Sequence, residues 1–86
     1  MMKKNDNYIY VHINNEPMKL YIGRQYMFVT DSGLSMDGRL VQFKSGSALG
    51  DMGEELVLQN MFKWFHFRVE SIVSISEVIY DNRNRD

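Results

Sequence analysis

The stretch GRQYMFVTDSGLSMDGRLVQF, residues 23–43, predicts most of the fold of this 86-residue chain. Tyr26, Phe28 and Thr30 alternate with their neighbours, as in a strand that has one buried face. An Asp-Ser-Gly turn follows, in which Gly33 can adopt a positive φ. The chain then returns in a second apolar stretch, so the whole segment predicts a β-hairpin.

The returning strand changes phase along its length. Met36, Gly38 and Leu40 share one face. Further on, Val41 and Phe43 carry the apolar character instead. A phase change within a strand indicates a β-bulge or a sharp bend, and Gly38 leaves the backbone room for one. Since small barrels need such bends to close, this strand favours a small β-barrel.

Further strands are predicted on both sides of this hairpin. Their apolar residues either alternate or form short runs bounded by glycine, serine and asparagine, which is typical of strands in small all-β domains. The expected elements are strands at 8–13, 55–60, 62–69 and 72–79, a glycine-rich loop at 44–55 and a tight junction at 70–71.

Residues 16–22 have two interpretations. They could form the second strand of a hairpin with residues 8–13. They could instead form a short helix, with Asn15 as N-cap, Pro17 in the first turn and Gly23 just past the end. We favour the helix, because the apolar residues here leave one apolar side without a strict alternation.

Length and composition set the bounds. The chain predicts one domain, 1–86, with its core in 18–79 and loose termini at 1–7 and 81–86. Cysteine is absent, so no disulfide or thiolate metal site is available, and the net charge of −1 gives no broad basic field. No apolar stretch predicts a transmembrane helix, and the N-terminus does not resemble a secretory signal. We therefore expect no membrane partner and a cytoplasmic location.

Several spacings are similar to those of the Sm-like family of small β-barrels. From Gly23, the apolar positions and the glycine ten residues on resemble the first Sm motif. Residues 56–58 resemble its leucine-rich third strand, and residues 67–75, FRVESIVSI, resemble the second Sm motif. The resemblance covers residues 18–79. It implies an all-β, five-stranded SH3-like barrel of Sm type, here with an added N-terminal strand at 8–13, and a homo-oligomer that binds single-stranded RNA.

The residues that would contact RNA depart from the family pattern. Lys44 stands where the family has an aspartate, Glu55 where it has an asparagine, and Val69 where it has a glycine. Arg68 alone is retained. The resemblance implies Arg68 as the main ligand contact, with Lys44 and Arg39 as the cations that would assist it, and it implies less for RNA binding than for the fold.

The strand at 62–69 is aromatic on both faces. Phe65 and Phe67 fall on one face, and Phe62 and Trp64 on the other. Either the strand at 8–13 covers the second face, or Phe62 and Trp64 meet a partner, since exposed aromatic clusters mark interfaces. Sm-like rings pair this strand with the last strand of a neighbour, which would add Val73 to the interface.

No residue pattern predicts catalysis. His12 and His66 are the two histidines, and neither has a second ligand or a carboxylate at metal or catalytic spacing. We expect no enzyme activity, metal or cofactor. The leading hypothesis is a non-enzymatic, homo-oligomeric module that binds RNA or a nucleotide-like ligand. The alternative is a protein–protein interaction module, such as an adaptor or a small inhibitor of another protein.

Overall fold

A computed structural model describes residues 7–46 and 53–79, and it confirms the predicted all-β class. The predictions for the N-terminal residues 1–6 and for the C-terminal tail lie outside the described residues. The elements are β1 Tyr8–Ile13, β2 Glu16–Tyr21, β3 Gln25–Thr30, β4 Ser35–Ser45, β5 Glu54–Asn60, β6 Lys63–Arg68, the 3-10 turn η2 Val69–Ser71 and β7 Ile72–Glu77.

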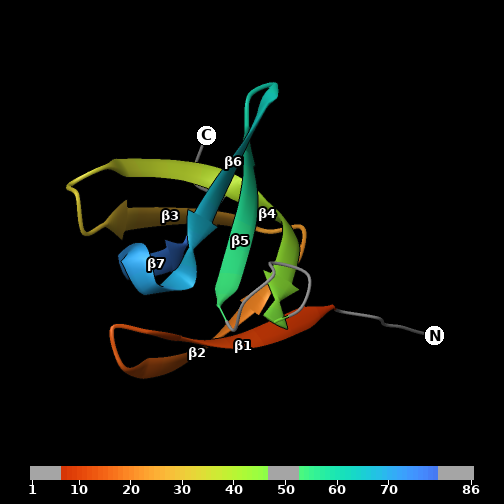
Figure 1. The fold of residues 1–86 in the computed structure, drawn as a ribbon. Helices are drawn as coiled ribbons and strands as arrows, with labels where there is room; N and C mark the ends of the chain where they lie inside the picture. The colour runs from red at the N-terminus through yellow and green to blue at the C-terminus, as the bar shows by residue number, and fades with distance from the viewer. Residues whose placement is uncertain (1–6, 47–52, 80–86) are drawn as a thin grey trace.

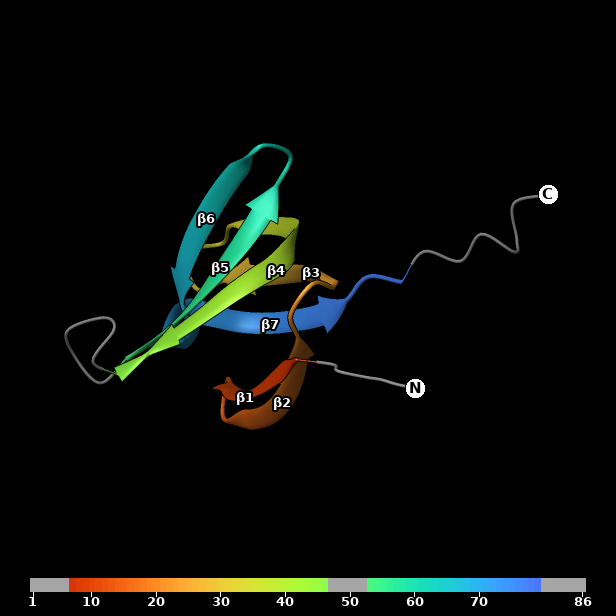
Figure 2. The same cartoon turned by 90° about the vertical axis from the view of Figure 1, so that its right-hand side faces the viewer.

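The strands form two antiparallel sheets. β1 and β2 pair only with each other, and the other five strands follow the order β6-β5-β4-β3-β7 (Figure 1). The larger sheet curves strongly but is not closed into a barrel, because β6 and β7 are its two edges and η2 joins them in sequence. Figures 1 and 2 both place the β1–β2 hairpin at one end of the molecule and the tip of the β5–β6 hairpin at the other.

The predicted bulge in β4 is present, three residues beyond Gly38. The register between β4 and β5 shifts between Leu40 and Gln42, so Val41 is the extra residue. Gly38 serves a different purpose, since a Cβ there would lie 3.1 Å from the Gln59 carbonyl oxygen. Glycine thus permits close packing of β4 on β5, while the bend follows from Val41.

The core lies on the concave side of the large sheet and beneath the β1–β2 hairpin. Phe28 is fully buried and its ring meets Phe67 edge to face, with 4.8 Å between the ring centroids. Burial of this apolar set is the main stabilising contribution to the fold. Its buried members are Val11, Ile13, Leu20, Tyr26, Phe28, Leu40, Leu56, Leu58, Val69, Ile72 and Ile75.

The preferred helix at 16–22 is wrong, because residues 16–21 form β2. Asn14 and Asn15 both have positive φ, 55° and 70°, which is the pattern of the type I′ turn that closes a two-residue hairpin loop. Pro17 lies opposite His12, next to the pair that closes the loop. Such a pair is not hydrogen-bonded in an antiparallel ladder, so Pro17, which lacks an N–H, removes no bond.

Other boundaries also differ from the prediction. The strands predicted at 62–69 and 72–79 are shorter, at Lys63–Arg68 and Ile72–Glu77, whereas pairing extends further than expected in two places. The loop expected at 44–55 is shorter, because β4 continues to Ser45 and β5 begins at Glu54; residues 47–52 lie outside the described part. Asn7, expected in the loose terminus, accepts a hydrogen bond from the Ile22 backbone N–H at 2.9 Å. Cross-strand pairing therefore extends further at both places than the polar composition indicated.

Tyr26 links β3 to the β1–β2 hairpin, and its hydroxyl makes the stability of the fold fall at alkaline pH. It is 2% exposed, and its hydroxyl accepts a hydrogen bond from the Tyr21 N–H at 2.8 Å. Burial raises the pKa of Tyr26 above its ordinary value. The unfolded chain therefore loses this proton first, so the stabilisation is complete below about pH 10 and is lost as the pH rises through the folded pKa.

We predict that Tyr26→Phe lowers the free energy of unfolding by about 1 kcal/mol at neutral pH, because the Tyr21 N–H loses its acceptor. The same change should make the loss of stability above about pH 10 shallower, because one titrating group is removed. Urea denaturation across a pH series measures both effects, with the exposed Tyr10→Phe as control. An alkaline slope identical to that of the unmodified chain would contradict this account.

Candidate functional site

Two of the three predicted ligand residues lie together on the outer face of the large sheet. Lys44 on β4 stands opposite Glu55 on β5, which stands opposite Arg68 on β6. The three side chains therefore form one cross-strand row. The structure places Lys44 and Arg68 two strands apart in this row, with the carboxylate of Glu55 between them.

Arg39 lies in a different row. It stands opposite Gln59, which stands opposite Trp64, and its Nη2 donates a hydrogen bond to the Gln59 Oε1. Gln59 and Glu55 are four residues apart on β5, a separation of about 13 Å along a strand. The three predicted cations are thus not one patch, and Arg39 is not placed to assist Arg68 on a single small ligand.

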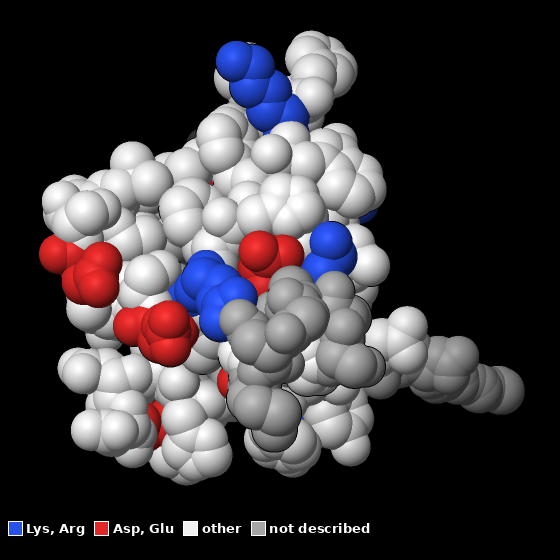
Figure 3. Space-filling model, viewed as in Figure 1, with Lys and Arg blue, Asp and Glu red and all other residues white. Residues whose placement is uncertain are grey.

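The carboxylate of Glu55 controls the charge of the row that holds Lys44 and Arg68. Its Oε1 lies 3.1 Å from Nδ1 of His66, and its side chain is 17% exposed. A half-buried carboxylate between two cations offsets part of the attraction they would exert on a phosphate. Figure 3 shows acidic and basic side chains interleaved on this side of the molecule.

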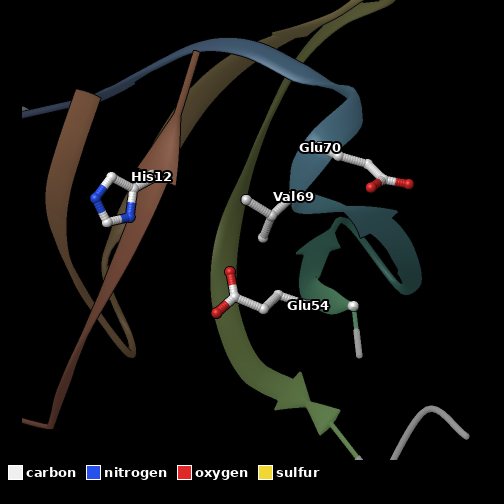
Figure 4. Close-up of a pocket in the computed structure, with 5 residues that line it drawn as sticks. His12, Glu54, Val69 and Glu70 are labelled. Atoms are coloured by element: carbon white, nitrogen blue, oxygen red, sulfur yellow. The ribbon is translucent and has the colours of Figure 1, made fainter. Parts of the chain in front are cut away.

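A small hollow lies beside this row, at the junction of β1, β5 and η2. Its volume is about 230 Å³ and it is lined by His12, Gly53, Glu54, Val69 and Glu70. Figure 4 shows Glu54 extending toward His12, whereas the Glu70 carboxylate points away from both. This volume is below that of most small-molecule sites, about 300 Å³ and above, so we do not assign it a ligand.

The two histidines are not brought together. His12 faces outward on β1, and His66 contacts Glu55 on the outer face of β6. Within residues 7–46 and 53–79, no group of three or more histidine, cysteine or acidic side chains is close enough to hold a metal ion.

The end of the β5–β6 hairpin is the most exposed apolar part of the described chain. Met61, Phe62 and Trp64, which we call the hairpin tip, are 81%, 94% and 57% exposed. Phe67, in contrast, packs against the core, on the face that it shares with Phe65. The idea that residues 8–13 cover the outer aromatic face is wrong, since β1 turns its apolar side to the core and Trp64 remains exposed.

The loop at the hairpin tip has unfavourable chemistry for a turn. Asn60 pairs with Lys63, so Met61 and Phe62 form a two-residue loop. Met61 has φ 60°, a positive value at the first loop position, where such hairpins usually place glycine. A non-glycine residue in this region costs about 1–2 kcal/mol. The loop sequence is therefore not optimised for stability.

Val73, the third predicted interface residue, lies on the opposite edge of the sheet. It is on β7 and is 39% exposed. In the described residues, β7 pairs only with β3, and β6 pairs only with β5. Each edge strand therefore presents an outer side that carries no strand partner within the described chain.

The structure also reveals an aromatic and cationic surface that the sequence interpretation missed. Tyr8 stands opposite Tyr21, and Tyr10 opposite Lys19, on the outer side of the β1–β2 hairpin. The alternation of tyrosines in residues 8–13 was visible in the sequence. The contribution of Lys19 and Tyr21 was missed because a helix was predicted at 16–22. These two residues join this face only if residues 16–21 form a strand.

No family model matches the chain, and neither does any curated protein or any solved structure. In the described part of the chain, no helix has the length and apolar content needed to cross a bilayer.

Proposed function

We propose that the chain is a non-enzymatic protein-binding module, that the hairpin tip is its binding surface, and that a second copy of the chain is its first partner. This proposal combines two hypotheses from the sequence analysis, the protein–protein interaction module and the homo-oligomer. The observation that carries it is the exposure of Met61 and Phe62 in a loop where Met61 holds a positive φ that favours glycine.

The contrast with the other two-residue loop supports this proposal. The β1–β2 loop uses Asn14 and Asn15, which adopt positive φ at low cost. The β5–β6 loop instead exposes Met61 and Phe62 to solvent. Backbone strain together with exposed apolar surface indicates a functional constraint on the loop, because neither feature stabilises the isolated domain.

The arrangement of the sheet edges supports self-association. The strand at 63–68 and the last strand are the two edges, so β6 of one copy could extend the sheet along β7 of the next. This is the pairing that the Sm-like resemblance implies. We accordingly also propose that the curved sheet is an SH3-like fold of Sm type, in which Trp64 and Val73 lie at the contact between copies.

We predict that Met61→Gly combined with Phe62→Asn leaves the chain monomeric and raises the free energy of unfolding by about 1 kcal/mol, since glycine relieves the positive φ. Light scattering over a concentration series measures the mass, and urea denaturation of samples dilute enough to be monomeric measures stability. A merely structural loop would gain stability without any change in mass.

The matched control is Leu34→Ser, which removes an exposed apolar side chain from the β3–β4 turn, where Leu34 is 44% exposed. It should leave the mass of the assembly unchanged. An unmodified chain that stays monomeric at all concentrations would contradict self-association. A double variant with the oligomer mass of the unmodified chain would exclude the hairpin tip as the contact.

A second candidate function, RNA or nucleotide-like ligand binding, is favoured by the row that Lys44 and Arg68 share. Arginine can contact phosphates and bases through several donors at once, and a lysine two strands away could hold a neighbouring phosphate. Glu55 between them limits the attraction, so we place this function second.

For this candidate we predict opposite effects of two substitutions. Arg68→Ala should weaken binding of a short oligouridine at low salt about tenfold or more, as for loss of a charged hydrogen-bond donor. Glu55→Gln should strengthen it about fivefold, because the opposing charge is removed. Fluorescence anisotropy measures both, with Lys63→Ala at the hairpin end as the control cation. Binding that ignores both substitutions would rule this row out.

A further inference from the structure

The outer side of the β1–β2 hairpin is an unpaired sheet face built from aromatic and basic side chains. Its inward residues enter the core, whereas its outward residues are exposed or half-buried. By register, the outward set is Tyr8 with Tyr21, Tyr10 with Lys19, and His12 with Pro17. None of these six side chains is acidic.

The rings and the cation are in direct contact. The Lys19 Nζ lies 4.3 Å from the centroid of the Tyr8 ring and 6.0 Å from that of Tyr10. The two tyrosine rings meet edge to face at an interplanar angle of 85°. The hydrogen bond with the Tyr21 side chain raises the pKa of Lys19 above its ordinary value.

Charge distinguishes this face from the row on the large sheet. Glu55 separates Lys44 from Arg68, whereas nothing acidic stands between Tyr10 and Lys19 in the β1–β2 ladder. The nearest ion pair lies to one side, where Arg24 extends over the Tyr21 ring and contacts Glu77 at 3.4 Å. The tyrosine face therefore offers an unopposed cation beside open rings.

We propose that this tyrosine face binds single-stranded nucleic acid, with one base stacked on the Tyr10 ring and an adjacent phosphate held by Lys19. Tyr10 is 63% exposed, and Tyr8 stands across it, so Tyr10 is the ring that can offer a face to a base. Proteins that bind single-stranded nucleic acid combine exposed aromatic rings with positive charge. The rings stack on the bases, and the charge holds the phosphates that link them.

The position of the face is compatible with self-association. The β1–β2 hairpin and the tip of the β5–β6 hairpin lie at opposite ends of the molecule (Figures 1 and 2). The hairpin tip of the same copy therefore lies away from the β1–β2 hairpin that carries Tyr10. The proposal does not rest on self-association, and it uses none of the residues of the Lys44–Arg68 row.

The test uses the full chain and fluorescently labelled oligouridine and oligothymidine of about ten nucleotides, a length that one small β-domain can cover. Tyr10→Ala should weaken anisotropy-measured binding between about fivefold and about 150-fold, the range for loss of one stacked base. Tyr10→Phe, which keeps the ring, should bind like the unmodified chain. Lys19→Gln should reduce the slope of log affinity against log salt by about 0.7, the value for one phosphate on a single strand.

Further arms separate the possible failures. A DNA duplex of the same length should bind more weakly than either single strand, because its bases are already stacked. Lys63→Ala, which removes an exposed cation at the end of the β5–β6 hairpin, should leave the oligonucleotide affinity unchanged, and the mass of the assembly should not depend on Tyr10. Heparin, which lacks bases, should show no loss with Tyr10→Ala.

Two results would overturn the proposal, provided that thermal melting shows Tyr10→Ala to be folded. One is oligonucleotide binding that Tyr10→Ala leaves unchanged. This result would mean that the oligonucleotide binds elsewhere, and it is also expected if the tyrosine face recognises a protein instead. The other is no binding of either oligonucleotide by the unmodified chain at low salt. Neither result depends on whether the hairpin tip mediates self-association.

Discussion

The bulge at Val41 is the constraint on which the rest of the sheet depends. β4 has to pair with β3 through its first half and with β5 through its second half, with its apolar side chains on the concave face in both. A regular alternation that buries Leu40 would turn Phe43 to solvent and Lys44 into the core. The extra residue resets the alternation, so Leu40 and Phe43 both face inward. The outward position of Lys44, and hence its row with Glu55, is a consequence of this one irregularity.

Two hairpins with two-residue loops differ in the chemistry of those loops. At one end, an asparagine pair satisfies the backbone and brings Lys19 beside Tyr10. At the other end, Met61 adopts a positive φ and Phe62 contacts little else. The large sheet is stabilised by its cross-strand pairing and by the Phe28–Phe67 contact. It can therefore tolerate a strained loop at the end of the β5–β6 hairpin. The residues that are unusual for a tight turn, Met61 and Phe62, thus lie in a loop whose side chains are exposed and outside the core.

The sequence predicted the elements whose burial is one-sided and left open those whose residues suit two conformations. Residues 8–13 and the hairpin around Gly33 were predictable, because period-two alternation has no helical equivalent. Residues 16–21 were not, because Pro17 is acceptable both in a first helical turn and at the free edge of a strand. The site followed the same division. The resemblance grouped Lys44, Arg68 and Arg39 as one candidate site, but Arg39 lies in another row. A face formed by pairing β1 with β2 could not be predicted while residues 16–21 were taken as a helix.

The distribution of charge favours recognition by contact rather than by a long-range field. With a net charge of −1, this chain exerts little long-range attraction on a polyanion, and at physiological salt fields from exposed charges decay within about 8 Å. A single cation is then effective only where a second interaction holds the ligand against it. Around Arg68 the neighbouring group is the carboxylate of Glu55, which opposes an anion. Around Lys19 the neighbouring groups are rings, which stack on bases without repelling phosphates. The physical argument for binding a polyanion is therefore stronger at Lys19 on the β1–β2 hairpin, which the sequence left undecided, than at Arg68, which the resemblance implied.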